Sequence, residues 1–139
     1  MNLDRLRINE LSDDAWSWYQ RYLDALDAYA LERYAEFLAD EVSVQFNNDA
    51  PLAGKAAAKA GLGQFWGSIS AMGYALLHEP LNIYGSDSAF VLEALNHYDR
   101  PDRDRITVRA AAFTDRATDG RVTSVRLYQD VSPLYAGAS

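Results

Sequence analysis

The sequence has 139 residues, the size of one domain, and its shares of hydrophobic (49%) and charged (24%) residues are those of an ordinary soluble protein. Its 20 Asp and Glu residues outnumber its 13 Lys and Arg residues, and the net charge of −7 disfavours a nucleic-acid partner. Cysteine is absent, which excludes disulfides, thiolate chemistry and zinc–sulfur sites.

The first ten residues mix charged and apolar side chains without a long apolar run, so they lack the pattern of a secretory signal. No apolar run in the sequence approaches the roughly 20 residues that cross a bilayer. We therefore expect a cytoplasmic protein with no membrane partner.

Helical signals are confined to the first half of the sequence. Ser12 and Asp13 are favourable N-cap residues, and Asp27 is a second candidate N-cap. Apolar residues recur at helical spacing after the first of these caps, at Trp16, Tyr19, Leu23 and Leu26. These patterns predict helices over 13–26, 28–39 and 55–70, with a half-buried strand at 42–47.

The second half alternates apolar and polar side chains, which is typical of strands. We predict strands over 74–84, 89–99, 105–115 and 121–131, the last two joined by a turn around Asp119-Gly120. Pro80 interrupts the first of them, which favours an edge strand or a β-bulge. Helices followed by a run of antiparallel strands predict an α+β fold.

The order of these elements resembles the nuclear transport factor 2-like superfamily, and two segments carry the resemblance further. AEFLADEVSVQF (Ala35 to Phe46) is similar to the helix-to-strand junction of that superfamily, and DGRVTSVRLYQDVSPL (Asp119 to Leu134) to the SnoaL-like form of its last strand. The resemblance implies a single SnoaL-like domain over 1–139, with its core at 12–134. Its fold is expected to be a cone-shaped α+β barrel, with three N-terminal helices packed on a strongly curved antiparallel sheet.

Three activities known on this scaffold imply different site residues. Asp130 falls where limonene-epoxide hydrolases keep a catalytic aspartate, but Ala94 and Asn96 stand where those enzymes have an arginine and a second aspartate. Ketosteroid isomerases have a general-base aspartate near the position of Phe46 and a second carboxylate within the run 110–112, which is all alanine here. SnoaL-like polyketide cyclases use a pocket aspartate or histidine for proton transfer, and Asp130 matches its general location. The resemblance thus implies acid/base catalysis by Asp130, with Asn96 orienting the ligand.

Asp130 nevertheless has two interpretations. Apolar pocket walls would raise its pKa and suit a general acid or base, whereas the solvated end of a strand would leave it a structural role. If the preceding turn is a two-residue loop, Arg109 lies opposite Asp130, and an ion pair would instead lower that pKa. His78 is an alternative acid or base. His97 is expected on the opposite face, and the two histidines lack metal-ligand spacing, so we expect neither a metal nor another cofactor.

The pocket is expected to be lined by Trp16, Tyr19, Phe46, Trp66, Leu92 and Ala94. Apolar walls with few polar groups fit a small hydrophobic ligand, such as a polyketide-like, terpenoid or steroid-like compound. We also expect a homodimer that pairs the outer sheet faces through positions such as His97, Val125 or Tyr128. The alternative is a non-catalytic ligand-binding or dimeric interaction module with a degenerate pocket.

Overall fold

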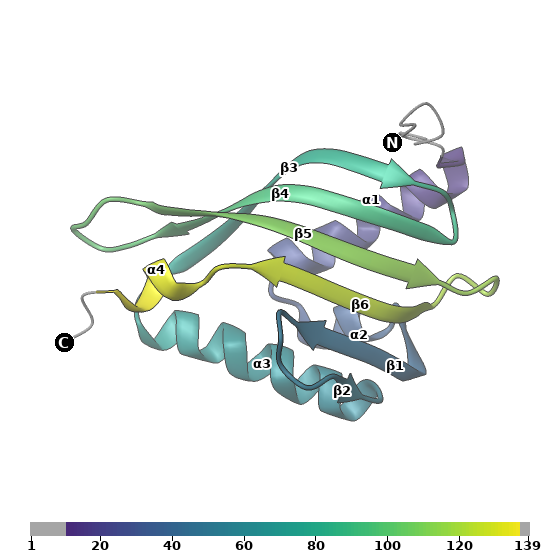
Figure 1. Cartoon of the computed structure of the whole chain (residues 1–139), viewed down its shortest axis with the longest axis horizontal. Coiled ribbons are helices and arrows are strands. Elements are labelled where there is room, and N and C mark those ends of the chain that lie inside the picture. Colours follow the sequence, from purple (N-terminus) through teal and green to yellow (C-terminus); the bar gives the residue numbers. More distant parts are fainter. Residues whose placement is uncertain (1–10, 137–139) are drawn as a thin grey trace.

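A six-stranded, curved sheet forms the body of the protein, and helices lie along one of its faces (Figure 1). The computed structural model describes residues 11–136, so the segment 1–10, for which we predict no secretory signal, lies outside the described residues. The strands lie side by side in the order β2-β1-β6-β5-β4-β3. Helices α1, α2 and α3 leave the opposite face of the sheet open, and this arrangement confirms the predicted α+β fold.

Two of the three helices match their predicted ranges closely. They are α1 (Asp13–Asp27) and α3 (Lys55–Ala71). Ser12 caps α1 as predicted, because its Oγ accepts a hydrogen bond from the backbone N–H of Ala15 at 3.1 Å. α3 packs close to β2 (Leu52–Ala53), where a Cβ at Gly61 would collide with the side chain of Leu52.

α2 (Leu31–Ala35) is much shorter than the predicted helix over 28–39. Tyr29 adopts a left-handed backbone conformation (φ 52°) before α2, and β1 already begins at Leu38. The helix does not continue here, despite the local helical pattern, because Leu38 pairs with Val122 of the last strand, a contact between distant parts of the chain. The predicted helical state is therefore wrong for residues 28–30 and 36–39.

The long strands follow the predicted order. They are β1 (Leu38–Phe46), β3 (Ala75–Gly85), β4 (Ala89–Asp99), β5 (Ile106–Arg116) and β6 (Val122–Gln129). β1 pairs with β6 in parallel, so the expectation of a wholly antiparallel sheet is wrong at this one pair. The chain crosses over through α3 and three hairpins before it returns beside β1 in the same direction. The sequence reasoning missed β2 and the short α4 (Ser132–Tyr135).

The structure confirms both features that Pro80 predicted for β3. The strand lies at the edge of the sheet, and its register with β4 slips between Pro80 and Asn82. The edge position and the β-bulge that Pro80 predicted are thus both present, because a proline at such a place removes no ladder hydrogen bond.

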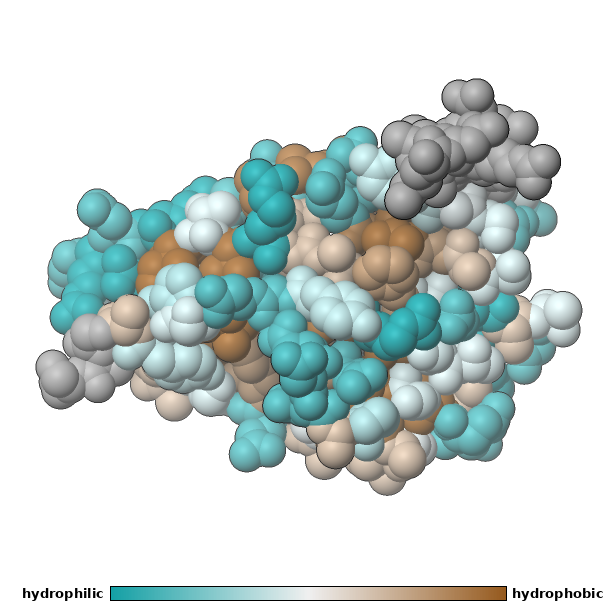
Figure 2. Space-filling model, viewed as in Figure 1, coloured by the Kyte–Doolittle hydropathy of each residue, from teal (hydrophilic) through white to brown (hydrophobic). Residues whose placement is uncertain are grey.

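The hydrophobic core lies between the inner face of the sheet and the helices. Its larger cluster includes Tyr19, Leu38, Phe90 and Val122, and a smaller one surrounds Tyr98. The outer face of the sheet carries polar side chains with apolar patches between them (Figure 2). In the described part of the chain, no helix has both the length and the apolar character needed to cross a membrane.

Candidate functional site

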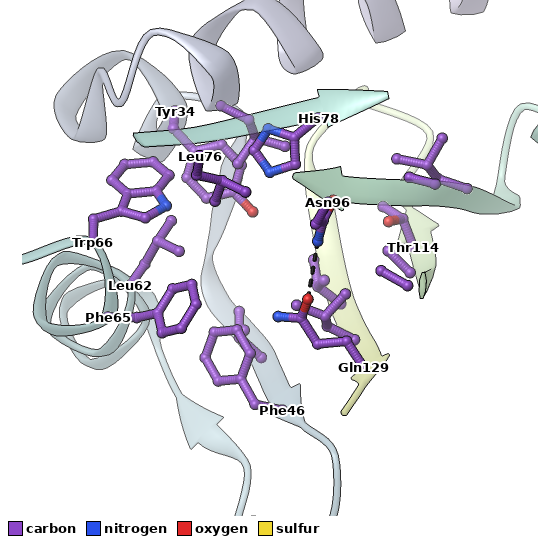
Figure 3. A pocket seen from close by; sticks show the side chains of 18 of the residues that line it. Tyr34, Phe46, Leu62, Phe65, Trp66, Leu76, His78, Asn96, Thr114 and Gln129 are labelled. Carbon is purple, nitrogen blue, oxygen red and sulfur yellow. Dashed lines mark hydrogen bonds between the residues drawn. The ribbon is translucent and has the colours of Figure 1, made fainter. Parts of the chain in front are cut away.

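A cavity of about 100 Å³ lies between the inner face of the sheet and helices α1, α2 and α3 (Figure 3). Its walls are mostly aliphatic and aromatic. Polar side chains from the strands join them at His78, Asn96, Thr114 and Gln129, and tyrosine hydroxyls add to these. An apolar cavity with a few convergent polar groups has the character of a small-molecule site.

Most of the predicted pocket residues do line this cavity, namely Tyr19, Phe46, Trp66, Leu92, Ala94 and Asn96. Trp16 does not line it, since its side chain is 43% exposed on a surface groove beside Leu81. The reason is the orientation of α1, whose buried stripe consists of Ala15, Trp18, Tyr19, Tyr22 and Ala25. Of the predicted stripe, Tyr19 is fully buried, and Leu23 and Leu26 are partly buried and pack against the core. The expectation fails at Trp16, because the centre of the buried face lies nearer to Trp18 and Tyr22 than predicted.

Asp130 lies outside the cavity, which corrects the expectation for the central candidate of the sequence analysis. Gln129 pairs with Ala110 and faces the cavity, so the next residue points to the outer face of the sheet. The exposed Asp130 carboxylate accepts hydrogen bonds from Ser132, including one from its backbone N–H at 3.0 Å, and they lower the pKa of Asp130. The raised pKa expected for a pocket carboxylate is therefore wrong.

The structure confirms the strand register that sets Asp130 opposite Arg109, but among the described residues it contains no ion pair between the two side chains. The register of β5 with β6, continued by one residue, sets Arg109 opposite Asp130, and both line a shallow depression on the outer face. Within residues 11–136, however, the two side chains form no ion pair. The lowered pKa of Asp130 comes from Ser132 and not from Arg109.

An amide pair occupies the polar side of the cavity. Asn96 Nδ2 donates to Gln129 Oε1 at 2.9 Å, and both side chains are buried. The backbone of Gln129 is fixed by Asn47, whose side chain accepts from Gln129 N at 2.9 Å and donates to Gln129 O at 2.7 Å. This double hydrogen bond lies at the end of β6 and fixes the backbone from which the Gln129 side chain extends to Asn96.

His78 lines the cavity and contacts a carboxylate. Its Nδ1 lies 2.5 Å from Oδ1 of Asp27, the last residue of α1. Asp27 thus serves this contact and not the predicted N-cap, since Ala30 holds the N-cap position of α2. A carboxylate at Nδ1 keeps the neutral ring protonated there, so that Nε2 carries the lone pair. Figure 3 shows the His78 ring on the cavity side of β3, near Leu76 and Asn96.

His97 lies on the other face of the sheet, as expected from strand alternation. Its Nε2 lies 2.5 Å from Oε2 of Glu79, and its Nδ1 lies 2.8 Å from Oγ1 of Thr107. The protein thus holds two histidines with similar carboxylate partners, one at the cavity and one away from it.

Buried tyrosines line the cavity from both sides, Tyr22 and Tyr34 from helices α1 and α2 and Tyr98 from β4. The hydroxyls of Tyr22 and Tyr34 lie 2.9 Å apart. Burial raises the pKa of Tyr34 to about 12 and that of Tyr22 well above its ordinary value. Burial likewise raises the pKa of Tyr98 to about 12, and no hydrogen-bond partner for its hydroxyl lies in the described part of the chain. These hydroxyls therefore stay neutral and act as hydrogen-bonding groups in the neutral pH range.

The comparisons with known proteins agree with this fold. A SnoaL-like domain matches residues 19–125, which is most of the chain. The protein belongs to the SnoaL-like domain family. No curated protein matches its sequence.

Solved structures similar to this SnoaL-like protein include enzymes and enzyme candidates. A candidate polyketide cyclase from Xanthomonas campestris pv. campestris shares 20% identity over 90% of this chain and 96% of its own, with a TM-score of 0.72. An epoxide hydrolase of the LEH-like type from M. tuberculosis shares 18% identity over 88% and 87%, with a TM-score of 0.66. SalBIII, an epoxide hydrolase/cyclase-like enzyme with a role in pyran ring formation in salinomycin, shares 11% over 86% and 92%, with a TM-score of 0.70. At these identities the likeness shows the fold alone.

The SnoaL-like protein has no aspartate or glutamate among the described residues that line its cavity. Nor do residues 11–136 contain a cluster of three or more His, Asp or Glu side chains able to hold a metal ion. Three side chains of β6 face the cavity, namely Val125, Leu127 and Gln129. Of the two β6 positions expected on the outer face, Tyr128 is exposed there, whereas Val125 is buried at the cavity, so that expectation is wrong for Val125. The sequence analysis missed Gln129, because it set the alternation of this strand the wrong way at Val125. The contact of Asp27 with His78 had no signal, because 51 residues separate them.

A more open groove of about 520 Å³ adjoins the cavity of the SnoaL-like protein, between α3, α4 and the end of β1. Phe46, Phe65, Leu127 and Gln129 line both spaces and therefore form the wall between them. Figure 3 shows the rings of Phe46 and Phe65 next to each other at this wall. Movement of these side chains would open a path from the groove to the cavity.

Proposed function

We propose that this protein binds a small, mainly apolar molecule in its cavity and catalyses proton transfer at the polar side of that molecule through His78. The apolar walls supply the binding free energy by removing the ligand surface from water. The single observation that carries the catalytic part is the contact of His78 Nδ1 with Asp27 Oδ1 at 2.5 Å, in a ring that lines the cavity.

The geometry suits a histidine that acts as a general base and then as a general acid. With its proton on Nδ1, the neutral ring offers the Nε2 lone pair to a proton on a carbon next to a ligand carbonyl. The C–H bond breaks, its electrons pass to the carbonyl oxygen as an enolate, and Nε2 holds the proton until it returns to carbon or oxygen. The Asp27 carboxylate stabilises the imidazolium that exists between the two transfers.

A specific observation favours a second function, that of a non-catalytic binding module. The polar side of the cavity is dominated by the amides of Asn96 and Gln129, which form hydrogen bonds but do not transfer protons. The two functions share the cavity and differ in whether His78 exchanges protons with the ligand.

Cyclohexanone in D₂O provides the test. Binding is followed by NMR through the side-chain amide signals of Asn96 and Gln129, and catalysis through exchange of the ketone's α-protons for deuterium. His78→Gln should slow protein-catalysed exchange by about 10²–10⁴-fold, the usual contribution of a positioned acid or base, with binding kept. His97→Gln is the matched control and should leave exchange unchanged, because His97 lies away from the cavity.

The outcomes separate the alternatives. Binding without any catalysed exchange would favour the non-catalytic module. Exchange that survives in His78→Gln would remove His78 as the catalytic residue. Unperturbed amide signals for every apolar probe, phenol and toluene included, would contradict the binding function itself.

A further inference from the structure

Two buried polar atoms have no hydrogen-bond partner in the described part of the chain. They are Asn96 Oδ1 and the Tyr98 hydroxyl oxygen. Asn96 is 5% exposed and Tyr98 is fully buried. Buried polar groups in folded proteins nearly always have a partner, so an unpaired one requires a partner from outside the chain, either an ordered water molecule or a ligand.

Both atoms belong to side chains that line the cavity. Asn96 and Tyr98 are two residues apart on β4 and therefore project from the same face of the strand. Their neighbours across the β3–β4 ladder are His78 and Leu76, which line the cavity too. The side chains that carry the unpaired atoms thus lie on the side of the cavity where the proposed proton transfer takes place.

The hydrogen bonds around Asn96 decide which kind of group is missing. Its Nδ2 donates to Gln129 Oε1, so its free atom is the acceptor Oδ1. His78 cannot supply a donor through Nδ1, because that nitrogen is engaged with Asp27. An acceptor without a donor calls for a ligand with an O–H or N–H group.

We infer that the ligand of this cavity carries a hydroxyl group, as a phenol or an alcohol does, and that this O–H donates to Asn96 Oδ1 while the Tyr98 hydroxyl takes a second oxygen of the ligand. The inference rests on the proposed binding function and names the substrate class of the same site. Hydrocarbons and ethers would leave Oδ1 unpaired and so bind with a penalty, whereas dihydroxylated rings would satisfy both atoms. The remainder of the ligand is apolar, because the other walls are.

Phenol and toluene test the inference, since they have nearly the same shape and differ in one O–H. The dissociation constants are measured by NMR titration in the wild type and in Asn96→Leu, which keeps the side-chain size and removes the acceptor together with the Nδ2 donor to Gln129. We expect the preference for phenol over toluene to fall by about 10-fold or more in Asn96→Leu, the low end of what an unpaired buried acceptor costs. Toluene should bind the variant as well as the wild type or better.

A second variant covers the case in which Asn96→Leu does not fold. Tyr98→Phe removes one oxygen that has no partner to lose, and it should abolish the extra affinity of resorcinol over phenol. Tyr128→Phe, on the outer face with 46% exposure, is the matched control and should change nothing.

The possible failures are distinguishable. If toluene binds and the phenol preference is the same in the wild type and both variants, the hydroxyl inference is overturned and the binding function stands. Binding of cyclohexanone more tightly than cyclohexanol would also overturn it, because the free atom would then act as a donor. If none of the probes binds, the binding function fails together with the inference.

Discussion

Replacing Tyr22 with phenylalanine removes one of the two hydroxyls in the buried Tyr22–Tyr34 pair. The two oxygens lie 2.9 Å apart, and both side chains are about 95% buried, at 5% and 6% exposure. The substitution leaves the Tyr34 hydroxyl without this partner in an apolar environment. Leaving a buried group unpaired costs about 1–3 kcal/mol, so the free energy of unfolding should fall by that amount.

Tyr98→Phe makes the same chemical change at a hydroxyl that has no partner among the described residues. Nothing is left unpaired by its removal, and an unsatisfied polar atom disappears from the interior. The free energy of unfolding should therefore stay the same or rise slightly. The two substitutions differ only in the hydrogen bonding of the oxygen that they remove.

Urea denaturation followed by far-ultraviolet circular dichroism measures both changes, and thermal unfolding supports them. At roughly 4 °C per kcal/mol for a chain of this size, Tyr22→Phe should lower Tm by about 4–12 °C. The reasoning is refuted if Tyr98→Phe destabilises the protein as much as Tyr22→Phe does. It is also refuted if Tyr22→Phe changes the free energy of unfolding by less than about 0.5 kcal/mol, the usual size of a neutral substitution.

Burial raises the pKa of Tyr34 to about 12. The stability that its neutral form contributes is therefore fully present below pH 10 and is lost as the pH rises toward 12. Phenolate absorbance measures this titration, and a transition near the ordinary pKa of tyrosine would contradict the prediction. Asp130→Asn should change neither probe binding nor proton exchange, because this carboxylate is exposed on the outer face. Loss of binding or exchange in this variant would show that Asp130 takes part in the site after all. Phe46→Ala should speed the entry of probes by opening the wall to the outer groove, which NMR exchange rates measure; an unchanged rate would place the path elsewhere. We propose that the chain forms a homodimer through the outer sheet face, where Tyr128 is exposed. In sedimentation at micromolar concentration, Tyr128→Lys should shift the dimer to a monomer. A monomeric wild type would count against the dimer.

Much of the fold follows from local patterns in the sequence. The strict alternation of β4 places Leu92, Ala94 and Asn96 on one face, and this face does line the cavity. The cap at Ser12 and the proline at position 80 each report a feature that the structure contains. Such signals are reliable because caps, turns and alternation are settled by residues within a few positions of one another.

Local sequence patterns mispredict the structure where contacts between distant residues override local preferences. The sequence predicts a helix over 36–39, but residues 36–37 form a turn, and β1 begins at Leu38, which pairs with Val122. The stripe predicted for α1 includes Trp16, yet packing against the sheet buries Trp18 in its place. Both outcomes depend on which surface the sheet offers, and that surface forms only when the whole chain is in place.

The sequence by itself determined the α+β class, the order of the long elements and the inward face of β4, because short-range periodicity sets these properties. It indicated the family through the resemblance of its segments 35–46 and 119–134 to the SnoaL-like domain. The tertiary structure alone decided that Gln129 and not Asp130 faces the cavity, since one step of register along β6 turns every side chain to the other face. It alone decided that Asp27, 51 residues away, orients His78. A site is built from such long-range contacts, which no local pattern encodes, and that is why the fold could be read from the sequence when the chemistry of its cavity could not.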